Sequence, residues 1–271
     1  MKKTMLEHPV LVEMSKIIDN MYRLGWDERN GGNVSYLLNE DEVKDYVDVN
    51  DVKRTYDINF DASELKGKYF LITGTGKYFR NTLDDPETNL GLIRISLDGK
   101  HAEVLWGFKD GGRSTSETYA HLMCHIERLK VNPKNRVIMH CHPTSTLALT
   151  HILPNDEKTF TLEMWRVMTE CIVVFPEGIG VLPWMLCGTY EIGRATADKM
   201  KEFRLVVWGL HGIYGAGETI DEAFGLVETV EKAADVYFKY HQFKELNTIT
   251  DEDLKVICDL FKVTPHKGYL K

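Results

Sequence analysis

The stretch Val137-Ile138-Met139-His140-Cys141-His142-Pro143 lies near the middle of the chain and governs the interpretation of the rest. Its apolar run ahead of Pro143 predicts a buried β-strand that ends in His-x-His. Because side chains on a strand alternate between its two faces, His140 and His142 point the same way. This spacing suits two imidazoles that bind one metal ion. Cys141, between them, faces the other side and is expected to be a small buried apolar residue.

A second apolar run, at residues 205–210, ends in His211-Gly212. Two strands that both end in histidine place three imidazoles, His140, His142 and His211, at one edge of a sheet. Three neutral nitrogens with an open fourth position are typical of a catalytic rather than a structural zinc site. The alternative is that each histidine is an ordinary hydrogen-bonded residue, which is the commoner role for a lone histidine at a strand end. The matching second motif favours the metal site, with one Zn²⁺ per chain.

The composition is that of a globular protein, with 271 residues, 43% of them hydrophobic, and a net charge of −8. The negative charge argues against nucleic acids and anionic membranes as general partners. No apolar run approaches the roughly 20 residues that span a bilayer, and no apolar signal core follows the first residues. The five cysteines are odd in number and lie in apolar segments, which predicts reduced thiols and a cytoplasmic protein.

Alternating helical and strand-like patterns predict an α/β fold in a single domain over residues 1–271. Helices are expected over 9–24, 116–130, 144–151, 158–169, 189–203 and from 219 onward. Besides the His-x-His strand, apolar runs predict strands at 34–38, 69–73, 92–97, 103–107, 171–176 and 205–210, with a hairpin turn at 98–100. Residues 1–30 are read as an N-terminal helical segment and 39–61 as a polar, flexible excursion. We expect a central mixed, largely antiparallel sheet with helices on both faces.

Three polar segments are candidates for binding an anion such as phosphate. Ser114-Thr115-Ser116 precedes Glu117 at the start of a predicted helix, where free N–H groups attract anions. Thr73-Gly74-Thr75-Gly76-Lys77 follows a predicted strand, and Asn30-Gly31-Gly32-Asn33 forms a turn. Glycines in both segments let the backbone approach a ligand. Each segment also has an ordinary explanation, as a helix cap, a tight turn and a loop after a helix stop.

Two glutamates are candidates for proton transfer. Glu117 begins the helix that precedes the His-x-His strand, and Glu170 precedes the apolar run at 171–176. A carboxylate beside a divalent metal can ligate the ion or act as a base. Each could equally be a solvated surface acid, and on the residues alone Glu117 is only slightly favoured.

Taken together, these segments resemble the class II aldolase/adducin family. The resemblance runs nearly end to end and rests on residues 30–35, 73–76, 115–117, 140–144, 169–185, 210–212 and 221–226. The histidine pair and Asn-Gly-Gly-Asn mark the family at large. The segment 169–185 points to the branch of the family that acts on rhamnulose phosphate.

The resemblance implies a zinc-dependent aldolase that reversibly cleaves L-rhamnulose 1-phosphate in rhamnose catabolism. It implies that His140, His142 and His211 bind zinc, that Glu117 is the catalytic acid/base, and that Glu170 is a second active-site glutamate. The positions implied to bind phosphate are Asn30, Asn33, Thr73, Gly74, Thr115 and Ser116, with Thr73 versus Thr75 left open. It also implies a homotetramer with active sites between subunits.

Three other functions fit part of the pattern. A sister aldolase or a pentulose-phosphate 4-epimerase would apply the same metal chemistry to another sugar phosphate. A zinc hydrolase also fits three histidines, but the sequence has no His-Glu-x-x-His helix. A non-catalytic, adducin-like binding module would be expected to lack the ligand set, whereas the three histidines and Glu117 are all present.

Overall fold

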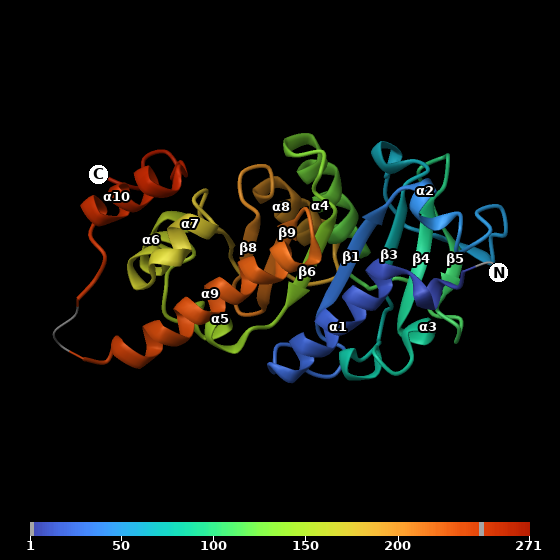
Figure 1. The fold of residues 1–271 in the computed structure, drawn as a ribbon, viewed down its shortest axis with the longest axis horizontal. Coiled ribbons are helices and arrows are strands. Elements are labelled where there is room, and N and C mark those ends of the chain that lie inside the picture. Colours follow the sequence, from blue (N-terminus) through green and yellow to red (C-terminus); the bar gives the residue numbers. More distant parts are fainter. Residues whose placement is uncertain (1–2, 244–246) are drawn as a thin grey trace.

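The computed structural model describes residues 3–243 and 247–271, and within them nine strands form one sheet with helices on both faces (Figure 1). The strand order across the sheet is β2-β5-β4-β3-β1-β6-β9-β8-β7. All neighbouring strands are antiparallel except β7 and β8, so the predicted mixed, largely antiparallel α/β fold is confirmed. The strands are β1 Asn33–Leu38, β2 Arg54–Asp57, β3 Tyr69–Thr73, β4 Leu90–Ile95, β5 His101–Gly107, β6 Val137–Cys141, β7 Gly180–Leu182, β8 Leu205–Trp208 and β9 Gly212–Gly217.

Two pairs of helices cover the two faces of the sheet. Helices α1 (Pro9–Arg23) and α9 (Ile220–Tyr240) cross one face, and α4 (Thr118–Val131) and α8 (Tyr190–Lys199) lie on the other (Figure 1). Strand β6 packs against the helices on both faces of the sheet. Met139 and Cys141 belong to the apolar cluster under α1 and α9, whereas Ile138 belongs to the cluster under α4 and α8. Cys141 is fully buried, as predicted, and His140 lies on the α4 side of the sheet.

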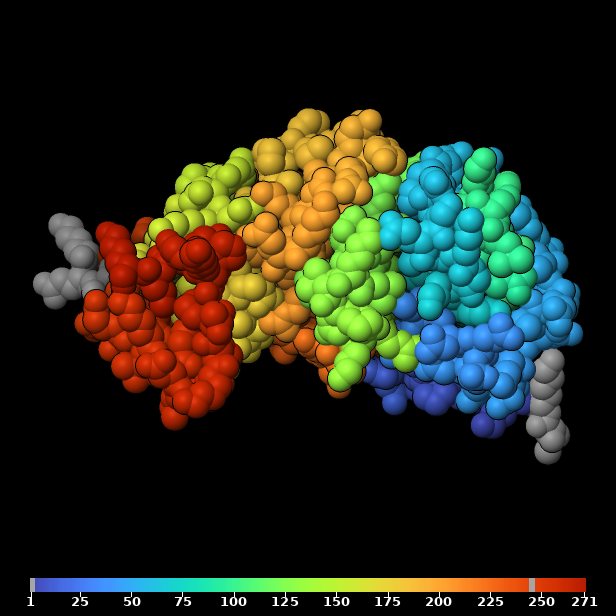
Figure 2. All heavy atoms as spheres, turned by 90° about the horizontal axis from the view of Figure 1, so that it is seen from above, coloured from blue at the N-terminus to red at the C-terminus, as the bar shows by residue number. Residues whose placement is uncertain are grey.

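The remaining helices lie at the ends of the molecule. Helices α6 (Glu157–Val167), α7 (Thr169–Val174) and α10 (Asp251–Phe261) gather around the C-terminal end, with α5 (Thr144–Leu149) under α9, and the short α2 (Glu40–Val43) and α3 (Pro86–Asn89) lie toward the other end (Figure 1). Seen from above, the molecule is elongated, with N-terminal residues at one end and C-terminal residues at the other (Figure 2). In the described part of the chain, no helix combines the length and the apolarity needed to cross a membrane.

Most predicted elements are present with shifted ends. The helix expected at 116–130 begins at Thr118, so that Glu117 is its N-cap, and the helix expected at 189–203 ends at Lys199. The hairpin turn at 98–100 joins β4 to β5. The strand expected at 205–210 ends at Trp208, because Leu210 adopts a left-handed backbone conformation with φ of 59°.

The structure corrects two predictions made from the sequence and adds elements that were not predicted. Residues 171–176 are not a strand, since Thr169–Val174 form α7, whose Cys171 and Ile172 pack into the core beside α6 and α9. The excursion at 39–61 is not merely a polar loop, because it contains α2 and the edge strand β2. The Gly-rich strand β9 and the helix α10 were not predicted. The error at 171–176 arose because a short apolar run does not distinguish a buried strand from a buried helical turn. Strand β9 was missed because glycines are uncommon inside strands and interrupt the pattern by which a strand is recognised.

Candidate metal and active site

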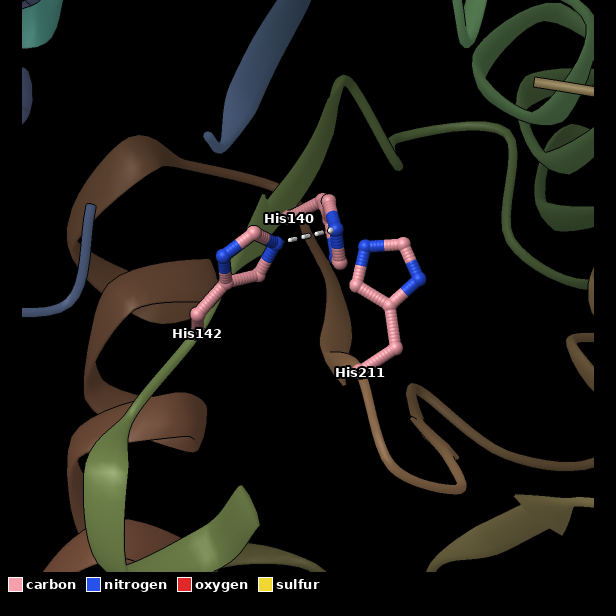
Figure 3. A group of neighbouring side chains, drawn as sticks. All are labelled: His140, His142 and His211. Carbon is pink, nitrogen blue, oxygen red and sulfur yellow. Dashed lines mark hydrogen bonds between the residues drawn. The ribbon is translucent and has the colours of Figure 1, made fainter. Parts of the chain in front are cut away.

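The three predicted histidines come together at the ends of β6 and β8. The ligand nitrogens of His140, His142 and His211 all lie within 4.8 Å of one another, and His140 Nε2 is 3.2 Å from His142 Nε2 (Figure 3). Two nitrogens that bind one tetrahedral zinc ion at about 2.0–2.1 Å are about 3.4 Å apart, so the pair has the right separation. The two strands are not adjacent in the sheet, because β9 lies between them. His211 instead reaches the site from the turn that joins β8 to β9.

Hydrogen bonds to His140 and His142 fix which nitrogen of these two rings faces the site. His140 Nδ1 is 3.0 Å from the carbonyl oxygen of Ile213, and His142 Nδ1 is 3.0 Å from both carboxylate oxygens of Glu28. Both partners only accept hydrogen bonds, so each Nδ1 carries the proton and each Nε2 lone pair is directed at the site. Burial holds the pKa of His140 well below its usual range and lowers the pKa of His211 to about 4. Two of the three imidazoles are therefore neutral near pH 7, which is the form that binds a metal.

Two glycines leave room for the ring of His142. A Cβ on Gly31 would lie 2.9 Å from His142 Cε1, and a Cβ on Gly212 would lie 2.8 Å from His142 Cδ2 and 2.4 Å from the carbonyl oxygen of Cys141. Any larger residue at either position would have to displace the imidazole or the backbone. Gly31 of the Asn-Gly-Gly-Asn motif and Gly212 of the His-Gly motif thus have a packing reason, which is the close approach of two backbone segments to the imidazole of His142.

Glu117 lies beside the histidines and is almost completely buried, at 7% exposure. Its Oε2 is 3.7 Å from His140 Nε2 and accepts hydrogen bonds from the Tyr214 hydroxyl at 2.6 Å and from Asn33 Nδ2 at 3.0 Å. Burial raises the pKa of Glu117, and the two donors act in the opposite direction by stabilising the carboxylate. Tyr214 was missed from the sequence because it lies on the unpredicted β9. Its ring also stacks on His140, with centroids 4.4 Å apart.

A cleft of about 270 Å³ opens over these residues. Five of the six predicted phosphate positions line it, as do Glu28 and Cys187. The lining from the predicted set is Asn30, Asn33, Gly74, Thr115, Ser116, Glu117, His140, His142 and His211. Segments more than 180 residues apart in the sequence therefore meet in one cleft, which a scan for local motifs detects only piece by piece.

Two members of the predicted phosphate set have other partners. The hydroxyl of Thr73 is buried and pairs with the backbone of β1, accepting from the N–H of Val34 at 3.1 Å, and Thr73 is not part of the cleft lining. The prediction of a phosphate contact by the Thr73 side chain is therefore not supported. The amide of Asn33 reaches the cleft, but it is held between Glu117 and His121.

Glu170 lies outside this cleft. It is exposed in the first turn of α7, at the C-terminal end of the molecule. The second carboxylate at the cleft is Glu28. No sequence motif points to this residue, because its contact with His142 spans 114 residues.

Residues 12–238 match the Class II Aldolase and Adducin N-terminal domain. The chain belongs to this class II aldolase and adducin family. A curated relative from Listeria innocua serovar 6a, named rhamnulose-1-phosphate aldolase, is 54% identical over 271 residues, covering 100% of this chain and 99% of the relative. A relative of the same name from Enterococcus faecalis is 51% identical over 267 residues, with 98% and 96% covered.

Solved structures of the family have the same fold. A sugar-phosphate aldolase from Thermotoga maritima superposes with a TM-score of 0.75 at 30% identity, covering 88% of this chain and 97% of that one. An L-fuculose 1-phosphate aldolase, with a TM-score of 0.62 at 21% identity and 93% and 96% covered, shows that the same class II aldolase fold extends to more distant sequences.

Replacing Glu28 by Gln is expected to weaken divalent-metal binding about 10- to 100-fold, because the acceptor that orients His142 loses its charge. A competition titration against a metal-chelating dye measures the affinity. Glu252→Gln, at an exposed glutamate on α10, is the matched control and should leave the affinity unchanged. Equal metal affinity in native protein and Glu28→Gln would contradict the orienting role of Glu28.

Proposed function

We propose that this chain is a zinc-dependent aldolase that reversibly cleaves L-rhamnulose 1-phosphate to dihydroxyacetone phosphate and L-lactaldehyde. The observation that carries the proposal is the placement of three converging imidazoles beside the buried Glu117 in one cleft. The full-length relatives named rhamnulose-1-phosphate aldolase support the choice of substrate. A non-catalytic binding module would have no use for a buried carboxylate next to a metal-ligand set, because burying both costs stability.

The reaction needs a site that accepts negative charge. Aldol cleavage leaves a carbanion on the ketone fragment, which must be delocalised as an enediolate. His140, His142 and His211 would hold the ion, and three neutral nitrogens with an open position favour zinc. Because these ligands are neutral, a zinc ion bound there would keep its full charge and would supply Lewis-acid stabilisation for the developing negative charge. A Schiff-base lysine is then unnecessary.

Glu117 would move the proton at the carbon of the dihydroxyacetone fragment. Tyr214 and Asn33 both donate to its Oε2, and among the described residues no donor reaches Oε1. The carboxylate is therefore anchored through one oxygen, and the other is left for the substrate proton. This arrangement orients the base without neutralising it, which is what general base catalysis requires.

The phosphate group would lie among neutral donors at the edge of the cleft. Asn30 and Ser116 are exposed cleft residues, and Thr115 and Gly74 lie beside them. Binding energy from this non-reacting end of the substrate would orient the reacting carbons over Glu117.

We further propose a cytoplasmic homotetramer whose active sites lie between subunits. Glu170 is exposed and outside the cleft of its own chain, so a catalytic role would require it to act on the cleft of a neighbouring subunit. Exposed apolar side chains next to the cleft support such contacts, since Trp184 and Leu186, which shortly precede the cleft residue Cys187, are each 63% exposed. The five free cysteines suit the reducing cytoplasm.

Glu117→Gln is expected to lower the turnover of L-rhamnulose 1-phosphate by roughly 10²–10⁴-fold, the usual contribution of a placed acid or base. Metal content, measured by elemental analysis, should stay near the native value. Glu127 is an equally buried glutamate on the same helix, at 7% exposure, and Glu127→Gln is the control for the loss of a buried charge. Near-native turnover in Glu117→Gln would move the acid/base role to another residue.

Replacing Asn30 and Ser116 together by Ala is expected to reduce the preference for L-rhamnulose 1-phosphate over unphosphorylated L-rhamnulose. The ratio of kcat/KM for the two substrates measures this preference, and both kcat and KM should change for the phosphorylated one. Ser63→Ala, on a surface turn far from the cleft residues, should leave the ratio unchanged. Equal cleavage of both ketoses by the native enzyme would refute the phosphate site.

Mixing two inactive variants tests the role of Glu170. Glu117→Gln and Glu170→Gln subunits, co-expressed with different affinity tags, are expected to form hybrid oligomers that regain part of the native activity. The reason is that an interface between the two variants contains one cleft with both native glutamates. If tag-purified hybrids stay as inactive as either parent, Glu170 does not act across a subunit interface.

A further inference from the structure

A chain of buried polar groups runs behind Glu117 into the sheet. The Ser35 hydroxyl is 2.7 Å from His121 Nδ1 and 2.8 Å from His125 Nε2. On its other side, His121 Nε2 bonds to Asn33 Oδ1, and Asn33 Nδ2 bonds to Glu117 Oε2 at 3.0 Å. Ser35, His121 and His125 all have 0% exposure. None of these three lines the cleft, so none contacts substrate, and the mechanism above makes no use of them.

The Glu117 end of this series of buried polar groups sets the direction of the hydrogen bonds along it. A carboxylate accepts, so the Asn33 amide presents its NH₂ group to Glu117 and its oxygen to His121. His121 Nε2 must then carry a proton. Complete burial lowers the pKa of His121 to about 3, so the ring is neutral and its Nδ1 is bare. Ser35 therefore donates its proton to His121 Nδ1 and accepts one from His125 Nε2.

The opposite end of the chain favours the same direction. His125 Nδ1 is buried and has no hydrogen-bond partner among the described residues. With the direction deduced above, this atom carries a bare lone pair in the buried interior, where the His125 and Phe70 ring centroids are 5.0 Å apart. Reversal of every bond would place an N–H donor there with no acceptor, and would turn the Asn33 oxygen toward the Glu117 carboxylate. Orphaned buried N–H groups are rarer than under-satisfied acceptors, so both ends oppose reversal.

We propose that Ser35, His121 and His125 are positioning residues for the aldol reaction, which lock the Asn33 amide with its NH₂ group on Glu117 and so hold the Glu117 carboxylate in its catalytic orientation. The inference rests on the proposed function and extends it to three residues that do not touch substrate. The amide of Asn33 could rotate if left alone, because its oxygen and nitrogen have nearly the same shape. The buried hydrogen bonds make one orientation of the Asn33 amide far more stable than the flipped one. Oε2 of Glu117 therefore keeps the Asn33 NH₂ group as a second donor beside the Tyr214 hydroxyl.

A matched pair of variants isolates the hydroxyl of Ser35. Thr and Val have the same shape, but only Thr keeps the hydroxyl that links the two histidines. We expect Ser35→Val to have a kcat about tenfold or more below that of Ser35→Thr, since misplacement of a catalytic group by a fraction of an ångström is costly. KM for the phosphorylated ketose and bound metal should be the same in the pair, because neither the phosphate positions nor the histidine ligands change. Equal kcat values in the two variants would overturn the proposal.

The native enzyme offers a second test that does not depend on how the variants fold. Nitrogen-15 NMR of the metal-loaded native enzyme, with labelled histidine, reports which ring nitrogen carries the proton. The His121 and His125 signals are identified by their loss in His121→Gln and His125→Gln. Both rings are expected to be protonated at Nε2, and protonation of either ring at Nδ1 would overturn the proposal.

These results separate the inference from the proposed function. If the native enzyme cleaves no sugar phosphate, the proposed function fails whatever the histidine tautomers are. If it cleaves L-rhamnulose 1-phosphate while the Ser35 pair have equal kcat or a ring is protonated at Nδ1, only the positioning role fails.

Discussion

The register between β1, β6 and β9 is the constraint on which the active site depends. Asn33 of β1 pairs with His140 of β6, and His140 pairs with Tyr214 of β9. The three residues therefore form a row across adjacent strands, on the face of the sheet where the N-terminus of α4 places Glu117. A one-residue slip in either pairing would turn a member of the row to the opposite face, into the apolar layer beneath α1 and α9. Correct strand pairing therefore also sets the positions of Asn33 and Tyr214, the two donors that hold the Glu117 carboxylate.

Two of the proposed metal ligands, His142 and His211, lie on loops that the same sheet anchors. His142 lies just beyond β6, where the chain turns into α5, and the first turn of that helix is fixed by Glu231 of α9. The carboxylate of Glu231 accepts the backbone N–H groups of Ser145 and Thr146 at 2.9 and 2.7 Å. A carboxylate at a helix N-terminus satisfies otherwise unpaired donors and interacts favourably with the helix dipole. Helix α9, through Glu231, therefore fixes the segment between β6 and α5 that carries His142 into the cleft.

Local sequence patterns could predict the parts of the site that are local and not those that depend on pairing. The two-residue period of a strand correctly placed His140 and His142 on one side, and the helix start correctly placed Glu117 at an N-terminus. Tyr214 could not be found, because its strand has three glycines and its role appears only when β9 pairs with β6. Ser35 and His121 are 86 residues apart and carry no motif of their own. The short apolar run at residues 171–176 predicts a strand, but packing against α6 and α9 favours a helix instead.

The polar row also limits how its members can change. Asn33, Ser35 and His121 are buried where an unpaired polar atom is costly, and each is satisfied only by the next. Removal of one member leaves its neighbour unpaired, so the free-energy cost of a single substitution includes the penalty at the adjacent residue. Substitutions at two neighbouring members should then be strongly non-additive, whereas a change at a distant core position should simply add. This hydrogen-bond network is therefore a single unit in energetic terms, and it ends at Glu117, the carboxylate that we propose as the acid/base.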